Sequence, residues 1–95
     1  MPRRNVQGVV YLLHFNQPYR HARHYTGWTL DLGSRIANHT AGTGARLVEV
    51  IIDAGIGFVV ARTWPGDRNR ERQLKRQGGA SRRCPICRAQ GRLFR

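Results

Sequence analysis

Two side chains one helical turn apart are the first candidates for chemistry in this 95-residue sequence. Arg35 and His39 are spaced i, i+4 in a segment that predicts a helix, so both lie on one face of it. That face borders the apolar positions Leu32 and Ile36, which places the two groups at the rim of a core. A guanidinium group suits phosphate oxygens, and an imidazole can bond a phosphate or move a proton. On spacing alone, an ordinary polar flank of a helix remains the better explanation.

A carboxylate is the second candidate, because the sequence holds only five acidic residues. Asp31 and Asp67 stand where helix N-caps are expected, so capping is their predicted role. Glu71 lies three residues before Leu74, the one apolar anchor of the predicted final helix, and shares its inward face. A carboxylate directed inward among arginines is either the centre of a structural ion pair or a metal ligand. Spacing favours the ion pair.

The elements that carry these residues are predicted from β-branched runs, helical spacing and turn residues. Tyr11 and Tyr25 lie in two strands of one hairpin, whose polar connection is expected to be longer than a tight two-residue turn. A phenol pair of this kind usually belongs to a core with satisfied hydroxyls. The apolar run 47–52 is compatible with a strand or a helix, and we favour a short helix. The expected elements are strands at 9–15, 24–29 and 57–63, helices at 31–42, 47–52 and 68–77, and a turn at 64–66. This order is α+β.

Together these residues form a pattern that resembles the GIY-YIG nuclease family, and most of all its small single-domain members. The pattern comprises Val9-Val-Tyr11, Tyr25-Thr-Gly27, Asp31-Leu32 and the pair Arg35 and His39, in order and at compatible spacing. The resemblance covers about residues 8–79, and we take 1–79 as the nuclease-like domain. It implies a small three-stranded antiparallel sheet flanked by helices. It also implies an endonuclease that hydrolyses DNA phosphodiester bonds with Mg²⁺ or Mn²⁺.

The resemblance assigns a role to each candidate residue. Tyr11 and Tyr25 match the tyrosines of the two triplets, and the first of these is proposed in the family to help activate the attacking water. Arg35 matches the arginine that contacts the scissile phosphate, and His39 a histidine that many members have. Glu71 matches the glutamate that binds the single cation. A phenol with a pKa near 10 is a poor base at pH 7, so Arg35 and the cation must lower that pKa or His39 must share the proton transfer.

Charge points to a polyanionic partner. The formal net charge is +12, and residues 67–95 contain ten basic residues against two acidic ones, a net of +8. A solvated basic tail is the simpler explanation, but nucleic acid is the better first hypothesis for so one-sided a charge. The residues expected to contact DNA are Arg68, Arg70, Arg72, Lys75, Arg76, Arg82 and Arg83.

Residues 80–95 are expected to form a basic tail that contains Cys84 and Cys87. A CxxC spacing provides half of a zinc site, and no second CxxC exists. The other potential ligands, His14, His21, His24 and His39, all lie far back in the chain. A zinc site could be completed by His21 or His24. It could instead be shared across a dimer or with a partner. Two free thiols are the interpretation that the sequence favours.

The sequence also bears on localisation, on the partner and on the alternative function. No apolar run is long enough for a membrane span and no secretion signal is recognisable, so a cytoplasmic protein is expected. DNA, double-stranded or branched, is the expected partner, with specificity from the tail, a homodimer or another protein. The alternative function is a catalytically weak or inactive nucleic-acid-binding module of the same fold.

Overall fold

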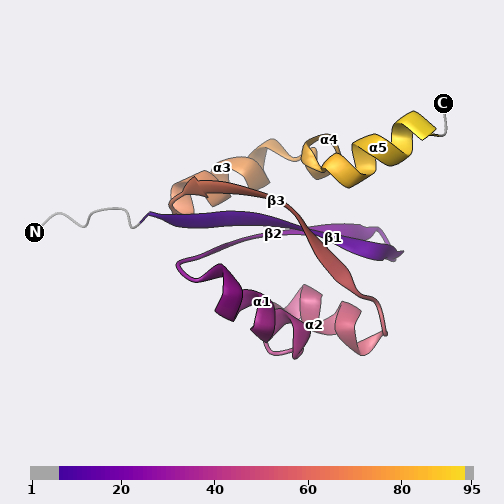
Figure 1. The fold of residues 1–95 in the computed structure, drawn as a ribbon, viewed down its shortest axis with the longest axis horizontal. Coiled ribbons are helices and arrows are strands. Elements are labelled where there is room, and N and C mark those ends of the chain that lie inside the picture. Colours follow the sequence, from indigo (N-terminus) through magenta and orange to yellow (C-terminus); the bar gives the residue numbers. More distant parts are fainter. Residues whose placement is uncertain (1–6, 94–95) are drawn as a thin grey trace, which may run out of the picture.

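An antiparallel sheet of three strands organises the chain (Figure 1). The computed structural model describes residues 7–93. The strands are β1 (Gly8–Tyr19), β2 (Ala22–Thr29) and β3 (Phe58–Gly66), in the spatial order β2-β1-β3. The central strand β1 therefore pairs on both sides, and β2 and β3 are the two edges. The predicted α+β class with a three-stranded antiparallel sheet is confirmed.

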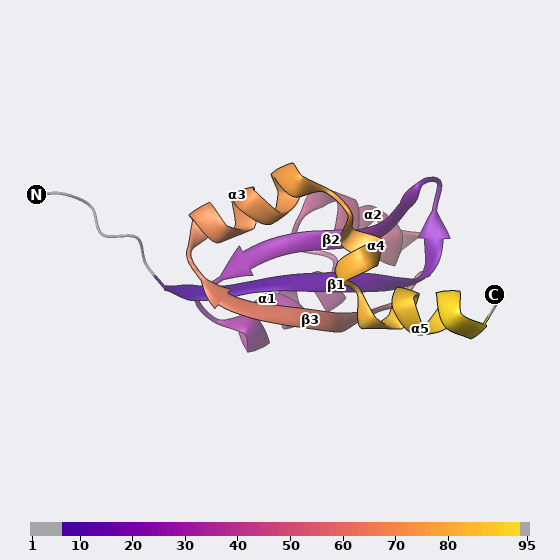
Figure 2. The same cartoon turned by 90° about the horizontal axis from the view of Figure 1, so that it is seen from above.

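Five helices flank this sheet in two groups. Helices α1 (Leu32–Thr40) and α2 (Arg46–Asp53) lie on one side of it in Figure 1. On the other side lie α3 (Arg68–Gln77), α4 (Ala80–Arg83) and α5 (Pro85–Leu93). Figure 2 shows α3 running alongside β2 and α5 lying near β3. Within residues 7–93, no helix has both the length and the apolar character that a membrane span requires.

The side chains of β1 alternate between the two faces of the sheet, as the pleat of a strand requires. Tyr11, Leu13 and Phe15 are buried in one cluster with residues of α2 and the following loop, Val48, Ile51 and Ile56. The residues between them along β1, Val10, Leu12 and His14, are directed to the opposite face and are also buried. Both faces of β1 are therefore covered, which explains its continuous apolar sequence.

The predicted helix caps are confirmed. Asp31 accepts a hydrogen bond from the backbone N–H of Ser34 at 3.1 Å and begins α1. Asp67 accepts one from the backbone N–H of Arg70 at 3.1 Å and begins α3. The run at 47–52 is a helix, as favoured from the sequence.

Two local predictions are wrong. The hairpin turns over Arg20 and His21 alone, with Arg20 at a φ of 56°, because both strands extend beyond their expected ends. Pro18 fits in β1 because the pairing with β2 is irregular between His14 and Tyr19.

The segment 64–66, expected to be a turn, is the end of β3 and pairs with the start of β1. Pro65 is tolerated because β3 is an edge strand. The indole N–H of Trp28 donates to the carbonyl of Gly66 at 3.0 Å, which ties this end of β3 to β2.

The segment expected as a basic tail is folded in its described part. Its residues form α4 and α5, and Cys84 between them has no exposed surface. Residues 94–95 lie outside the described part of the chain.

Candidate functional site

Three of the predicted site residues meet on the face of the sheet that α1 covers. The hydroxyl of Tyr11 in β1 lies 2.7 Å from Nε2 of His39 in the last turn of α1, and both side chains are buried. The ring of Tyr25 lies 6.2 Å from that of Tyr11 and 5.5 Å from that of His39, measured between centroids. The phenols and the imidazole therefore form one aromatic cluster with a hydrogen bond at its centre.

Two glycines make room for this cluster. Gly27 is the cross-strand partner of Tyr11, and a Cβ atom there would collide with Cζ and the hydroxyl of the Tyr11 ring. Gly44, in the loop after α1, lies against the imidazole of His39 in the same way. The glycine of the second triplet is thus required by the close approach of a phenol to the backbone.

Burial sets the protonation of the hydrogen-bonded pair. Desolvation raises the pKa of Tyr11, and the neighbouring Tyr25 and Glu71 raise it further, while the charge of Arg35 opposes them. The pKa of His39 is lowered by burial and, to a smaller extent, by Arg35. At neutral pH the phenol keeps its proton and the imidazole is neutral, so Nε2 can accept that proton. Among residues 7–93, Nδ1 of His39 has no hydrogen-bond partner.

Arg35 lies beside this cluster at the wall of a cavity of about 360 Å³. Arg68 lines the same cavity from the start of α3, and its guanidinium carbon lies 4.9 Å from the ring centroid of Trp28. Asp31 is also on the wall, but its carboxylate is used for capping α1. Two guanidinium groups on one open cavity suit an anion with several oxygens, such as a phosphodiester.

Glu71 faces the protein as its spacing from Leu74 predicts. Leu74 is 2% exposed, and the Glu71 side chain is 15% exposed. One Glu71 oxygen lies 3.3 Å from Nζ of Lys75, one turn further along α3. An ion pair is therefore present, as the spacing favours, but its partner is Lys75 and not one of the neighbouring arginines. Lys75 also lies over the ring of Tyr25, 5.6 Å from its centroid, which places this end of α3 beside the aromatic cluster.

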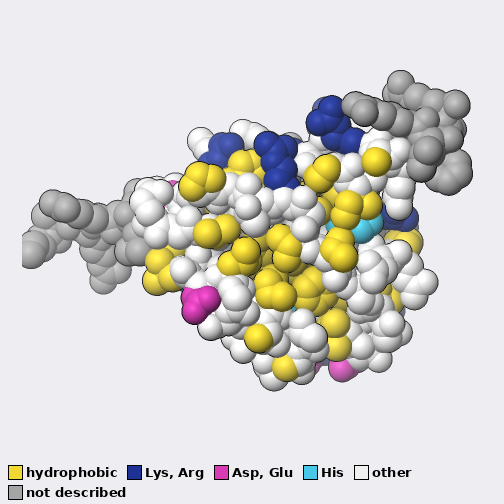
Figure 3. Space-filling model, viewed as in Figure 1, with side chains coloured by type: hydrophobic (Ala, Val, Ile, Leu, Met, Phe, Trp, Pro, Cys, Tyr) yellow, Lys and Arg dark blue, Asp and Glu magenta, His cyan; other side chains and the backbone are white. Residues whose placement is uncertain are grey.

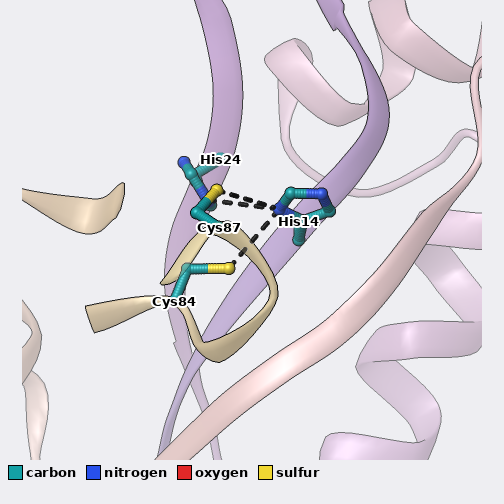
Figure 4. Close-up of side chains that lie close together, drawn as sticks. All are labelled: His14, His24, Cys84 and Cys87. Carbon is teal, nitrogen blue, oxygen red and sulfur yellow. Dashed lines mark hydrogen bonds between the residues drawn. The ribbon is translucent and has the colours of Figure 1, made fainter. Parts of the chain in front are cut away.

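A second group of side chains lies on the other face of the sheet, between β1, β2 and the junction of α4 with α5 (Figure 4). Its members are His14, His24, Cys84 and Cys87, whose four donor atoms all lie within 4.8 Å of one another. Nδ1 of His14 is 3.4 Å from Nε2 of His24 and 3.4 Å from Sγ of Cys84. Sγ of Cys87 is 3.3 Å from Nε2 of His24 and 3.5 Å from Nδ1 of His14.

This group could bind a metal ion, and its donors suit Zn²⁺ better than Mg²⁺. Thiolate and imidazole are the ligands of structural zinc sites, whereas Mg²⁺ takes oxygen ligands. Burial lowers the pKa values of His14 and His24, so both rings are neutral at pH 7, the form that binds metals. Among the residues described, the two cysteines form no disulfide.

The sequence predicts only part of this group. His24 is one of the two histidines expected to complete the site, but the other, His21, is exposed at the hairpin turn. Nothing in the local spacing singles out His14, although it is the direct cross-strand partner of His24. The register of the hairpin is the signal that pairs these two histidines on one face.

The basic residues expected to contact DNA lie on α3 and α4. In Figure 3 the Lys and Arg side chains of the visible face gather over the layer formed by α3, α4 and α5. Of the predicted contacts, Arg70 and Arg83 are only half exposed, and Arg83 donates to the carbonyl of Leu74 at 2.9 Å. The exposed members are Arg68, Arg72, Lys75, Arg76 and Arg82.

No family model matches the sequence, and no curated protein or solved structure is significantly similar to it. The arrangement of the site residues is therefore the basis for a functional assignment.

Proposed function

We propose that this protein is a divalent-cation-dependent endonuclease of the GIY-YIG type that hydrolyses DNA phosphodiester bonds. The observation that carries the proposal is the 2.7 Å contact between the phenol of Tyr11 and Nε2 of His39, with the ring of Tyr25 beside it. Arg35 and Glu71 both act electrostatically on the same phenol. The phenol of Tyr11 thus lies beside His39 and Tyr25 and within reach of the charges of Arg35 and Glu71. The family resemblance assigns all five residues to catalysis.

Glu71 fits the role of cation ligand. Its side chain is only 15% exposed, and within the described residues its ionic partner is Lys75, whose side chain is 50% exposed. An i,i+4 pair with one exposed partner contributes little to stability, so a cation could displace the lysine at small cost. One carboxylate suits Mg²⁺ or Mn²⁺, which keep several waters and bind phosphate oxygens. When bound, the cation would stabilise the charge on the phosphate and on the departing 3′ oxygen.

Tyr11 and His39 together provide the proton acceptor. The raised pKa of Tyr11 excludes the phenol as a base on its own at neutral pH. In the proposed step the water proton moves to the phenolic oxygen while the phenol proton moves to Nε2 of His39. The imidazolium that forms carries the proton until the leaving oxygen has been protonated by solvent. In this scheme the neutral His39 ring carries its hydrogen on Nδ1.

Arg35 orients the substrate. Its position on the wall of the cavity that Arg68 also lines suits contact with a phosphate group. Its guanidinium would also offset the negative charge that develops during in-line attack. The net charge of +12 provides the general attraction for DNA, which does not depend on base sequence.

A second function, nucleic-acid binding without turnover, is favoured by one observation. Tyr11 is 1% exposed, so an attacking water reaches its hydroxyl only if the site opens. The same cavity and the same basic helices would then serve for binding alone.

The two functions are separated by cleavage of supercoiled plasmid with Mg²⁺ or Mn²⁺, run beside EDTA and beside three variants. Glu71→Gln and Tyr11→Phe are expected to lower the nicking rate by about 100-fold or more. Glu49→Gln is the matched control, because Glu49 is the other glutamate and forms its ion pair with Arg46 on α2. It should cleave like the wild type.

Filter binding of the same DNA completes the experiment. DNA binding with no nicking by the wild type under either cation would support the binding module. Equal nicking by Glu71→Gln and Glu49→Gln would show that Glu71 does not hold the cation.

A further inference from the structure

The donor atoms of His14, His24, Cys84 and Cys87 lie close enough together to surround one ion. Four nitrogen and sulfur ligands at about 2.0–2.3 Å from a tetrahedral Zn²⁺ lie about 3.3–3.8 Å from one another. Four of the six donor–donor distances between these side chains are 3.3, 3.4, 3.4 and 3.5 Å, and all six are within 4.8 Å. A single ion among the four donors would therefore need only small side-chain adjustments to reach all of them.

We propose that these four residues bind one Zn²⁺ in a closed structural site that fastens α4 and α5 to the β1–β2 hairpin. All four positions would be filled by protein ligands, so none is left for water or substrate. This site is separate from the one proposed for hydrolysis, because His14 and Tyr11 project from opposite faces of β1.

Each half of the site is held by its own element. His14 and His24 are direct cross-strand partners, so the sheet fixes the distance between the two rings. Cys84 is the C-cap of α4, and its N–H donates to the carbonyl of Ala80 at 2.9 Å. Cys87 lies in the first turn of α5, which starts at Pro85. The ligand pairs come together because the chain returns to the sheet after α3.

Helices α4 and α5 need a source of stability beyond their own length and burial. Helix α4 has four residues and α5 has nine, which is too short for either to be stable alone in water. Among residues 80–90, Cys84 is the one fully buried side chain, so hydrophobic burial contributes little here. The segment also contains Arg82, Arg83 and Arg88, whose mutual repulsion opposes packing. Metal coordination would supply the missing free energy.

Charge favours the same ion. Two thiolates and two neutral imidazoles around Zn²⁺ have no net charge, so binding adds nothing to the +12 of the chain.

Metal content tests the proposal on full-length protein purified without a histidine tag or a nickel column. We expect one zinc per chain. Cobalt substituted for it should show the intense visible bands of tetrahedral coordination and a thiolate charge-transfer band. Cys87→Ser and His24→Gln should lose the metal. His21→Gln should keep it, since His21 is exposed at the turn and is the alternative ligand considered from the sequence.

Limited trypsin digestion measures how firmly zinc holds α4 and α5 against the sheet. Removal of zinc from the wild type by a chelator should speed cleavage after Arg82, Arg83 and Arg88 by at least about tenfold, and added zinc should restore protection. This readout does not require the ligand variants to fold, and neither measurement involves DNA, so a failed nuclease assay does not affect it. Wild-type protein that is folded, free of zinc and equally protected with and without added zinc would overturn the proposal. Full zinc in His24→Gln would overturn it as well.

Discussion

Nε2 of His39 lies 2.7 Å from the hydroxyl of Tyr11, although 28 positions separate the two residues in the chain. His39 is the one fully buried residue of α1, and Tyr11 lies in the middle strand of the sheet. The bond therefore joins α1 to the centre of the fold and, in the proposed nuclease, moves a proton. The same contact would therefore serve both stability and the proposed activity.

Removal of the phenolic hydroxyl should affect both properties. Tyr11→Phe leaves Nε2 of His39 buried without its partner, which should cost about 1–3 kcal/mol of unfolding free energy in urea. Tyr19→Phe, at the far end of the same strand, is the control and should change it by less than about 0.5 kcal/mol. Equal stabilities for the two variants would contradict the buried bond.

The lowered pKa of His39 predicts how stability depends on pH. Burial favours the neutral ring in the folded state, whereas the unfolded chain takes up a proton near pH 6.5. Between the pKa of His39 in the folded protein and its pKa in the unfolded chain, the unfolded state therefore binds more protons than the folded state. Stability should be constant above about pH 6.5 and fall as the pH drops below it. His39→Gln should show a shallower acid decline in denaturation midpoints measured under the same metal conditions. A decline as steep as that of the wild type would rule out His39 as a source.

Substitution by alanine should have opposite effects on stability at Gly27 and at Gly33. Gly27→Ala forces a methyl group against the Tyr11 ring and within 2.8 Å of the Tyr25 ring, so it should destabilise by about 1–3 kcal/mol. Gly33→Ala adds a methyl group at an exposed position of α1, 3.6 Å from a carboxylate oxygen of Asp31. It should stabilise by about 0.5 kcal/mol because alanine favours a helix. Thermal unfolding of both variants measures whether each substitution raises or lowers the stability. A change in the same direction for both variants would contradict the packing around Tyr11.

Neighbouring arginines of α4 should have separable roles. Arg83 donates to the carbonyl of Leu74 at 2.9 Å, so Arg83→Ala should lower stability by about 1–2 kcal/mol. Arg82 is exposed, so Arg82→Ala should leave stability unchanged. It should weaken DNA binding and lower the slope of log affinity against log salt concentration by the amount expected for about one phosphate contact. Urea denaturation and DNA titrations at several salt concentrations measure the two effects. A stability loss in Arg82→Ala as large as that in Arg83→Ala would show that the bond to Leu74 is unimportant.

Local patterns determined most of the secondary structure. Asp31 and Asp67 cap helices through atoms three residues away, so the sequence alone contains the information for both helix starts. The limits of β1 and β3 were predicted less well. Pro18 and Pro65 normally mark turns, and they are accommodated here only because of irregular pairing in one case and an edge strand in the other.

The sequence by itself determined the fold class, the order of the elements up to α3 and most of the residues that could do chemistry, but not α4, α5 or the part played by His14. It did not determine which of those residues meet. Cys84 lies 70 positions from His14, and only the return of α4 and α5 to the sheet brings their donor atoms to 3.4 Å. The hairpin register then makes His24, rather than His21, the neighbour of His14. Local spacing encodes helices and caps, whereas a four-ligand cluster depends on strand pairing and on the packing of distant segments, which no short pattern contains.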